Sequence, residues 1–328
     1  MLIDILYSAI CHSDIHIARE EWGPPYPSTL FPCVPGHEVI GRVAAVGNAV
    51  TKFRVGDTVG AGPMIASCRS CENCRADLEQ YCQVGWTLAF NTPDKISGGH
   101  NYGGFAERIM LPEHFVMRIP PRMNLAAAAP LLCAGITTFS PLQHWDASAG
   151  KRVGIIGLGG LGHLGVKLAA ARGADVTVFT SSPGKVDDAR RLGAREGVLW
   201  TETGMLEPYA DKFDLLISTL PVVVPTTPFT NLLRLDGTLV IVGAREPIDN
   251  VTGAGLWGRR RNVSASLMGG MAETQAMIDY CASRNIVADI ELISPDQIDR
   301  AFDRVKAKDV RYRFVLDLTR GRQAPAQA

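Results

Sequence analysis

The chain contains 328 residues, of which 46% are hydrophobic and 20% are charged, a composition typical of globular proteins long enough to form two domains. Its 33 basic residues balance its 33 acidic residues, and this neutrality argues against a protein that binds nucleic acid or a membrane surface. Because no apolar stretch has membrane-spanning length and no basic-then-apolar leader stands at Met1, the sequence predicts a cytoplasmic protein.

The N-terminal part of the chain predicts a barrel-like, mainly antiparallel β domain. Residues 2–10 have the β-branched and aromatic bias of a strand, and residues 39–59 contain short alternating segments separated by glycines. Strand character resumes at residues 105–117, after a loop rich in Gly, Asn and Pro. Two apolar helices are expected over residues 125–144, the first of them broken at Pro130.

Cys11 and His37 are candidate metal ligands. Thiolate and imidazole are ligand types that zinc prefers, and two of them at this separation predict a site completed by a third ligand from elsewhere, with an open position for substrate. Taken alone, Cys11 is better explained as a small buried hydrophobic residue and His37 as a hydrogen-bonded loop histidine. Cys133 lies where the first domain passes into the second, and by position alone it is better explained as a buried core cysteine.

A second group of cysteines has the spacing Cys68-x2-Cys71-x2-Cys74-x7-Cys82. Four thiolates at such close spacing can surround one tetrahedral ion and leave no open position, which indicates a structural zinc site. The alternative, an accidental cluster, would expose four oxidation-prone thiols. Because four of the eight cysteines crowd into one stretch, metal binding in a reducing cytoplasm is favoured over a disulfide framework.

A dinucleotide-binding unit begins near residue 151. An apolar strand at residues 153–156 is followed directly by Gly157-Leu158-Gly159-Gly160-Leu161-Gly162, then by a helical segment at 163–172 and a second strand at 175–179. This G-x-G-x-x-G motif inside a βαβ unit predicts that a pyrophosphate lies against the tight glycine turn and the helix N-terminus.

The end of the second strand indicates which dinucleotide binds. An NAD site has Asp or Glu there, about 20 residues beyond the glycines, to hold the ribose hydroxyls. This chain instead has Thr180, Ser181, Ser182 and Lys185, whose hydroxyls and ammonium group suit the 2′-phosphate of NADP(H). The alternative is a polar turn, since Ser-Pro-Gly is common in turns.

Alternating helices and strands continue to about residue 268 and predict a doubly wound parallel sheet. In this part, helices are expected at residues 186–192 and 228–235, and strands at 197–199, 213–219, 238–242 and 264–268. The remaining chain predicts helices at residues 272–283 and 295–306 and a strand at 313–318.

Together these motifs resemble those of the zinc-dependent medium-chain alcohol dehydrogenases. Stretches such as Glu21-Trp22-Gly23 and Asn285-Ile286-Val287-Ala288-Asp289-Ile290-Glu291 narrow the resemblance to the cinnamyl alcohol dehydrogenase branch and its bacterial aldehyde reductases. The resemblance covers almost the whole chain. It implies an α/β fold in which a discontinuous, mainly antiparallel GroES-like catalytic domain, residues 1–134 and 270–328, is interrupted by a Rossmann domain, residues 135–269.

The same resemblance implies two zinc ions per chain. The four-cysteine group would hold the structural ion, and Cys11, His37 and Cys133 would hold the catalytic one, with Glu38 behind it as a transient ligand or, alternatively, as a plain ion-pair partner. Zinc acts as a Lewis acid on the carbonyl oxygen, so that hydride from the nicotinamide can attack the carbon. The implied reaction interconverts primary alcohols and aldehydes with NADP(H), with aromatic or broad-range aldehydes as substrates.

Roles for residues around this metal also follow from the resemblance. Ser13 would pass on the substrate's proton, and His16 would end the relay to solvent. Asp14 would orient the imidazole of His37, or alternatively cap the following helix. His12 would lie near the cofactor pyrophosphate, with simple packing as the alternative.

Trp22, Trp86 and Met268 are candidate walls of a pocket for an aromatic or long aliphatic aldehyde, with core positions as the alternative for Trp86 and Met268. Cys33 and Cys281 are expected to be ordinary small hydrophobic residues. The resemblance further implies a homodimer, built through the outer strand of the cofactor domain near residues 264–268.

The chain departs from the family at its N-terminus, where only ten residues precede Cys11. Family members carry several more strands there, so either the true start lies upstream or the chain is a shortened member. If the chain begins at Met1, we expect unpaired strand edges and exposed apolar surface in the catalytic domain. The alternative function is that of a shortened, catalytically impaired member that binds NADPH and zinc. A zinc-independent quinone or enoyl reductase is disfavoured by the presence of Cys11, His37 and Cys133.

Overall fold

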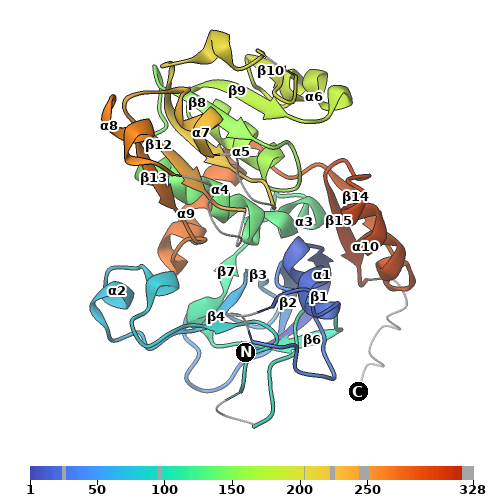
Figure 1. Ribbon diagram of the computed structural model, residues 1–328. Coiled ribbons are helices and arrows are strands. Elements are labelled where there is room, and N and C mark those ends of the chain that lie inside the picture. Colours follow the sequence, from blue (N-terminus) through green and yellow to red (C-terminus); the bar gives the residue numbers. More distant parts are fainter. Residues whose placement is uncertain (24–26, 95–97, 203, 222–225, 244–250, 320–328) are drawn as a thin grey trace. The chain divides into compact units, whose positions relative to one another are not determined.

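The computed structural model describes residues 1–319 except 24–26, 95–97, 203, 222–225 and 244–250 (Figure 1). The chain divides into two compact units. The first comprises Met1–Cys133 and the stretch that begins at Gly269, and the second comprises Ala134–Met268. The chain therefore leaves the first unit after Cys133 and returns to it at Gly269.

A mainly antiparallel sheet forms the centre of the first unit, as the sequence predicts. Its strand order is β14-β15-β1-β2-β3-β7, with β6 also paired to β1, and β14 runs parallel to β15. Its strands are β1 (Leu2–Ala9), β2 (Val39–Ala45), β3 (Thr58–Ala61), β6 (Arg108–Met110), β7 (Met117–Arg118), β14 (Ile290–Ile293) and β15 (Arg313–Asp317). A separate two-stranded sheet contains β4 (Met64–Ala66) and β5 (Thr87–Leu88).

Strand β1 is hydrogen-bonded along both edges. One edge pairs with β2, while the other pairs with β6 at residues 2–4 and with β15 at residues 7–9. The side chains of Ile3 and Ile5 are buried with Val39 and Val59, which explains the β-branched bias of this segment. The unpaired edge expected in this domain therefore does not lie on β1.

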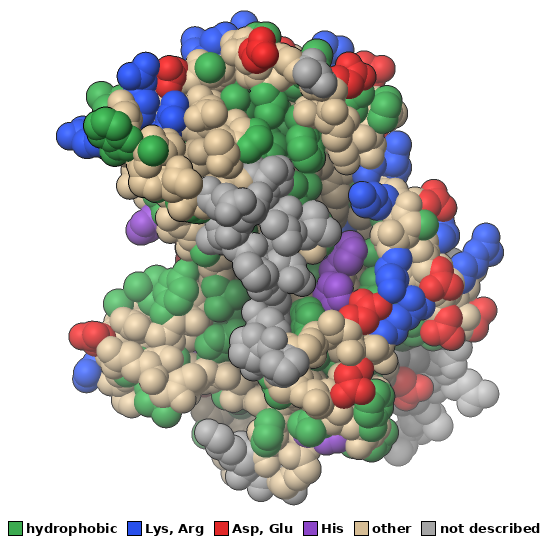
Figure 2. Space-filling model, in the orientation of Figure 1, with side chains coloured by type: hydrophobic (Ala, Val, Ile, Leu, Met, Phe, Trp, Pro, Cys, Tyr) green, Lys and Arg blue, Asp and Glu red, His purple; other side chains and the backbone are tan. Residues whose placement is uncertain are grey.

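Short helices connect the strands of the first unit. They are α1 (His12–Ala18), α2 (Glu72–Arg75), η1 (Glu79–Tyr81), η2 (Glu113–Phe115), α3 (Leu125–Ala128), η3 (Ala129–Leu132), α9 (Met271–Arg284), η6 (Pro295–Gln297) and α10 (Ile298–Lys306). Helix α10 packs Phe302 in a buried cluster with Ile15 of α1 and Phe314 of β15. Acidic and basic side chains are interspersed on the surface over α10 (Figure 2). Helix α10 is thus held against α1 by an apolar contact beneath a charged surface.

The second unit is the predicted doubly wound parallel sheet, with strand order β10-β9-β8-β11-β12-β13. Its strands are β8 (Arg152–Ile156), β9 (Asp175–Thr180), β10 (Glu196–Leu199), β11 (Phe213–Ser218), β12 (Leu233–Ile241) and β13 (Asn262–Ala265). Its helices are α4 (Ala134–His144), α5 (Gly162–Ala171), η4 (Pro183–Lys185), α6 (Val186–Arg191), η5 (Glu207–Tyr209), α7 (Thr226–Thr230) and α8 (Gly253–Trp257). The order reverses between β8 and β11, where open α/β sheets form a ligand-binding crevice.

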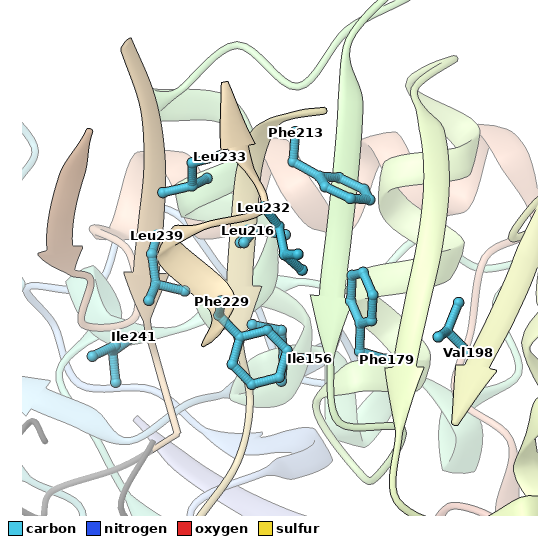
Figure 3. Close-up of a cluster of buried hydrophobic side chains, with 10 residues drawn as sticks. All are labelled: Ile156, Phe179, Val198, Phe213, Leu216, Phe229, Leu232, Leu233, Leu239 and Ile241. Carbon is cyan, nitrogen blue, oxygen red and sulfur yellow. The ribbon is translucent and has the colours of Figure 1, made fainter. Parts of the chain in front are cut away.

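A cluster of buried hydrophobic side chains, which includes three phenylalanines, packs against this sheet (Figure 3). The ring of Phe179 on β9 meets the rings of Phe213 and Phe229 edge to face, with centroids 5.5 and 5.9 Å apart. Edge-to-face pairs add to the stabilisation that burial already provides. The cluster anchors β9, whose carboxyl end carries the residues predicted to select NADP(H) over NAD(H).

The structure corrects four secondary-structure predictions. The strand expected at residues 264–268 is β13, Asn262–Ala265. Residues 105–117 do not form one strand, because Pro112, which lacks an N–H group, precedes the turn η2 that separates β6 from β7. The helix predicted at residues 228–235 ends at Thr230, and β12 begins at Leu233, which is fully buried in the core. Strand β14 was not predicted; its residues are half-exposed and show no clear alternation.

Among the described residues, no single helix combines the length and apolar character of a membrane span. One bent pair, Leu125–Leu132 with Ala134–His144, meets these criteria when its two parts are counted together.

Candidate metal centres and cofactor site

The four cysteines predicted to bind a structural ion lie together in the first unit. The sulfur atoms of Cys68, Cys71, Cys74 and Cys82 are all within 4.8 Å of one another. Cys71 directly precedes α2, Cys74 lies within it, and Cys82 follows η1. Two short turns therefore bring four sulfurs into a set that fits a tetrahedral zinc ion.

Backbone N–H groups in this lobe point at the sulfur atoms and favour thiolates. The N–H of Cys71 donates to Sγ of Cys68 at 3.3 Å, and the N–H of Cys68 approaches Sγ of Cys82 at 3.5 Å. The N–H groups of Ser70 and Cys71 lower the pKa of Cys68 to about 6, whereas burial raises the pKa of Cys74 to about 11. Because the thiolate is the zinc ligand, an easily ionised Cys68 suits metal binding.

Glu79 joins this lobe to two other parts of the first unit. Its side chain is buried, and Oε1 lies 2.7 Å from Nε2 of His114. Its Oε2 accepts a hydrogen bond from the N–H of Met271 at 3.1 Å, at the start of α9. The sequence analysis missed Glu79, because a single acidic residue with distant partners belongs to no local motif.

A second set of metal-binding side chains is buried in the first unit. The ligand atoms of Cys11, His37, Glu38 and Cys133 lie within 4.8 Å of one another. Cys11 directly precedes α1, His37 and Glu38 directly precede β2, and Cys133 follows η3. Ser13 places its Oγ 4.0 Å from Sγ of Cys11. The structure thus brings together the four side chains that the sequence analysis assigned to the catalytic metal.

Asp14 fixes the orientation of His37. Its Oδ1 accepts hydrogen bonds from Nδ1 of His37 at 2.9 Å and from the N–H of Gly36 at 2.8 Å. Its Oδ2 accepts from the N–H of Cys11 at 2.8 Å, which closes the N-terminus of α1. The carboxylate therefore both orients His37 and caps α1, the two roles that the sequence analysis gave as alternatives. Because Nδ1 is occupied, Nε2 is the nitrogen left for a metal.

Glu38 is buried and only partly hydrogen-bonded. Its Oε2 accepts a hydrogen bond from Arg313, whose Nη2 also donates to the carbonyl of Ile10 at 2.7 Å. Its Oε1 has no hydrogen-bond partner in the part of the chain that the structure describes. Burial raises the pKa of Glu38 to about 7. An unsatisfied carboxylate oxygen beside two thiols and an imidazole is a favourable place for a cation, so the donor set fits zinc.

The pKa values of the two thiols in this set are shifted in opposite directions, that of Cys11 downward and that of Cys133 upward. The neighbouring thiol of Cys133 holds the pKa of Cys11 well below its usual range, and His37 acts in the same direction. Burial would lower the pKa of His37, but Asp14 raises it well above its usual range. Cys11 is therefore the thiol of the pair that ionises first.

The predicted end of the proton relay lies on α1. Nδ1 of His16 is 2.9 Å from Oε2 of Glu21, whose Oε1 contacts Nζ of Lys306 at 2.6 Å. Lys306 lowers the pKa of Glu21. His12 is exposed at the start of α1, with its ring centroid 6.0 Å from that of His16. Glu21 and Lys306 were not singled out from the sequence as partners of His16.

In the second unit, the glycine motif forms the predicted turn between β8 and α5. Gly157 has a φ of 93°, and a Cβ at Gly162 would lie 1.9 Å from the oxygen of Gly157. Gly159, Gly160 and Leu161 complete the turn. A Cβ at Gly159 would meet nothing within 4 Å, so the packing of the chain does not demand glycine there. This open space at the N-terminus of α5 fits the approach of a pyrophosphate.

Two side chains that the sequence analysis missed contact the same turn. Oγ1 of Thr219, just after β11, lies 3.0 Å from the oxygen of Ile156 and 3.1 Å from that of Gly157. His163 is fully buried, with Nδ1 3.2 Å from the oxygen of Gly159. Neither residue type marks a motif at its position, so no sequence pattern indicated them.

The residues predicted to select NADP(H) follow β9 directly. Thr180 ends β9, and its Oγ1 accepts a hydrogen bond from the N–H of Ser182 at 3.2 Å. Ser181 is exposed, and Lys185 is buried in η4. No acidic residue occurs between Thr180 and Lys185, so no carboxylate in this turn would repel a phosphate.

The three predicted pocket residues have different surroundings. Trp22 is half-buried against a cluster that includes Phe90, and its ring centroid lies 5.6 Å from that of His16. Trp86 is half-buried before β5. Met268 is buried at the end of the second unit, with a φ of 47°. Trp22 thus lies beside the predicted relay, while pocket roles for Trp86 and Met268 stay predictions.

Comparison with known proteins places these sites in a family. Residues 1–121 match the family model of the alcohol dehydrogenase GroES-like domain, and residues 160–283 match that of zinc-binding dehydrogenase. The NADP-dependent alcohol dehydrogenase C 1 of Mycolicibacterium smegmatis is 48% identical over 315 residues, which cover 96% of this chain and 89% of that protein. The chain belongs to the zinc-binding alcohol dehydrogenase family. The resemblance found in the sequence is thereby confirmed.

Another relative and two solved structures support the same family assignment. Aldehyde reductase YahK of Escherichia coli is 46% identical over 317 residues, covering 96% of this dehydrogenase and 89% of the relative. A solved cinnamyl alcohol dehydrogenase of Sorghum bicolor matches with a TM-score of 0.93 and 39% identity, over 99% of this chain and 92% of that chain. A Helicobacter pylori enzyme of the same name, complexed with NADP(H), matches with a TM-score of 0.89 and 35% identity over 97% and 90%. The predicted pairing of a GroES-like and a Rossmann fold is confirmed.

Proposed function

We propose that this dehydrogenase transfers hydride reversibly between NADP(H) and a primary alcohol/aldehyde pair, with aromatic or broad-range aldehydes as substrates. The observation that carries the proposal is the buried set of Cys11, His37, Glu38 and Cys133, with ligand atoms within 4.8 Å of one another. Two thiols and one imidazole are the protein ligands of the catalytic zinc in alcohol dehydrogenases. Relatives named for NADP-dependent alcohol oxidation and aldehyde reduction support the choice of reaction.

In this proposal Cys11, His37 and Cys133 hold a catalytic zinc and the four-cysteine lobe holds a structural one. When bound, the catalytic zinc supplies Lewis-acid polarisation of the substrate oxygen. The chain orients the ligands. Asp14 engages Nδ1 of His37, which leaves Nε2 for the metal, and Arg313 holds one oxygen of Glu38.

For the cofactor, the glycine turn and the N-terminus of α5 would bind the pyrophosphate of NADP(H). Thr180, Ser181, Ser182 and Lys185 would bind its 2′-phosphate through hydroxyl groups and one ammonium group. This assignment is supported by the absence of an acidic residue from the turn after β9. His12 is the remaining candidate for a cofactor contact.

Ser13 and His16 would move the proton released or taken up with the hydride. Ser13 is next to the metal-binding set, with its Oγ 4.0 Å from Sγ of Cys11. Its hydroxyl can both donate and accept a hydrogen bond, as a proton relay requires. His16 uses Nδ1 toward Glu21, which leaves Nε2 for proton exchange. Trp22, whose ring lies beside that of His16, would form an aromatic wall for the substrate.

We also propose that the enzyme is a homodimer joined through the second unit. Strand β13 ends the sheet order, so one of its edges has no strand partner among the described residues. Trp257 and Leu267, on either side of β13, are 77% and 40% exposed. An open strand edge, with exposed apolar side chains nearby in the chain, favours pairing with a second copy. Light scattering of the purified enzyme would give twice the chain mass if the proposal is right.

The decisive experiment measures zinc per chain together with initial rates for NADPH and NADH against cinnamaldehyde. We expect two zinc ions and turnover that is faster with NADPH. Cys133→Ser should lose one zinc ion and the activity, whereas Cys281→Ser, a control at a buried cysteine outside both clusters, should keep both. Activity that survives Cys133→Ser would refute the catalytic-metal assignment. Two zinc ions and NADPH binding without turnover would identify the impaired, ligand-binding alternative instead.

A further inference from the structure

We propose that Thr219 is a positioning residue for the cofactor. Its hydroxyl would hold the first glycine of the turn in the orientation that receives the pyrophosphate. The inference rests on the proposed NADP(H) site and concerns the second unit alone.

Thr219 extends the pairing of two central strands beyond their ends. Strands β8 and β11 run parallel, and their register ends at Ile156 and Ser218. One residue further, the N–H of Thr219 donates to the oxygen of Ile156 at 2.9 Å. The hydroxyl of the same residue reaches the oxygens of Ile156 and Gly157, at 3.0 and 3.1 Å. Thr219 therefore ties the first residue of the glycine turn to the neighbouring strand.

Gly157 is the residue at which the chain leaves the sheet. Its N–H donates to the oxygen of Phe179 at 2.8 Å, and its φ is 93°. A Cβ at this position would lie 3.0 Å from Oγ1 of Thr219 and 3.0 Å from a side-chain carbon of Leu220. On the other side, the oxygen of Gly157 is so close to Gly162 that no side chain fits there. The peptide after Gly157 is thus confined between the Thr219 hydroxyl and the start of α5.

The direction of that peptide determines where the following N–H groups of the turn point. A threonine hydroxyl has one hydrogen to donate, and here two carbonyl oxygens lie within its reach. Its hydrogen is therefore directed at the turn rather than at a ligand. Loss of this hydroxyl should affect the part of the cofactor that lies against the turn, which is the pyrophosphate, and should spare the 2′-phosphate beyond β9.

The test compares Thr219→Val, which keeps the shape and removes the hydroxyl, with Thr219→Ser, which keeps the hydroxyl. Calorimetric titration would measure Kd for NADPH and for adenosine 2′-monophosphate, which has the 2′-phosphate and no pyrophosphate. We expect Thr219→Val to weaken NADPH binding by about five- to tenfold, the effect of one lost hydrogen bond, and to leave adenosine 2′-monophosphate unchanged. Thr219→Ser should bind both ligands like the unaltered enzyme.

Two further variants make the result specific. Thr230→Val removes another buried threonine hydroxyl of the second unit, bonded to the oxygen of Thr227 at 3.1 Å, and should leave both affinities unchanged. Lys185→Ala should weaken both ligands. Equal NADPH affinity in Thr219→Val, or an equal loss for both ligands, would overturn the inference and leave the proposed function standing. Failure of the unaltered enzyme to bind NADPH would instead refute the proposed cofactor site.

Discussion

The carboxylate of Asp14 is the best place to test how the metal-binding set is held. Asp14→Asn exchanges one oxygen of a fully buried side chain for an amide nitrogen of the same size. The carboxylate accepts three hydrogen bonds, two at Oδ1 from Gly36 and His37 and one at Oδ2 from Cys11. An amide has a single acceptor oxygen, so it cannot keep all three. In the better orientation the oxygen keeps Gly36 and His37, and the NH2 group faces the N–H of Cys11.

The cost follows from these contacts. A buried N–H group of Cys11 without an acceptor costs about 1–3 kcal/mol, and a neutral acceptor weakens the bond to His37 by about 1 kcal/mol. The total, about 2–4 kcal/mol, falls on two residues that are both proposed zinc ligands, and 1.4 kcal/mol corresponds to about tenfold in an equilibrium constant. If all of this cost fell on metal binding, zinc affinity would fall about 30–700-fold. Because part of it lowers the stability of the fold instead, we expect a fall of about 10–100-fold at the buried set, the usual range when the partner of a ligating histidine is lost.

The assay is the zinc content of the variant after dialysis against a graded series of chelator concentrations. Asp14→Asn should release one zinc ion at low chelator concentration and retain the ion of the four-cysteine lobe. A matched control is Asp317→Asn, at another buried carboxylate of the first unit, which is bonded to the N–H and hydroxyl of Thr319. Zinc release from Asp14→Asn within about threefold of the unaltered enzyme would refute the reasoning, because it would mean that the carboxylate does not orient His37.

Three further outcomes are expected. Ser181→Asp should lower the preference for NADPH over NADH by about tenfold or more, since a carboxylate repels the 2′-phosphate, and an unchanged ratio of kcat/KM would contradict the cofactor assignment. In zinc-free protein, the lowered pKa of Cys68 means that its thiolate predominates above about pH 6, while Cys74, with a pKa near 11, stays protonated. Alkylation followed by mass spectrometry should therefore rise through pH 6 at Cys68 first, and a midpoint near pH 9 would disprove this. Arg313→Met should lower the free energy of unfolding by about 1–3 kcal/mol in urea titrations, because Glu38 and the carbonyl of Ile10 would both lose a buried hydrogen-bond donor; a change below about 0.5 kcal/mol would show that the pair does not hold this site.

The features that the sequence predicted without the family resemblance share one property, which is that their physical cause is local. Four thiols that are close in sequence can enclose one ion without ligands from distant segments. The spacing from Cys68 to Cys82 predicts such a site directly. The glycine turn is equally visible, since Gly157 needs a positive φ and Gly162 has no room for a side chain. Secondary structure was predicted well where one face of the element is buried, as in β1. It was predicted poorly where packing against distant residues determines whether a segment is helix or strand, as at the start of β12.

The residues that hold the ligands in place could not be predicted in the same way, because their partners are distant in the chain. Glu38 is bonded to a residue 275 positions away, and the oxygen of Gly157 to one 62 positions away. Asp14 is the intermediate case, since its partner His37 is 23 positions away and the resemblance to a family was needed to suggest it. Ligand types and spacings therefore indicate which ion and which cofactor a chain can bind, but the affinity depends on contacts that only the fold creates. A relative that keeps every motif and loses the equivalent of Asp14 or Thr219 should look the same in sequence and bind zinc or NADPH more weakly.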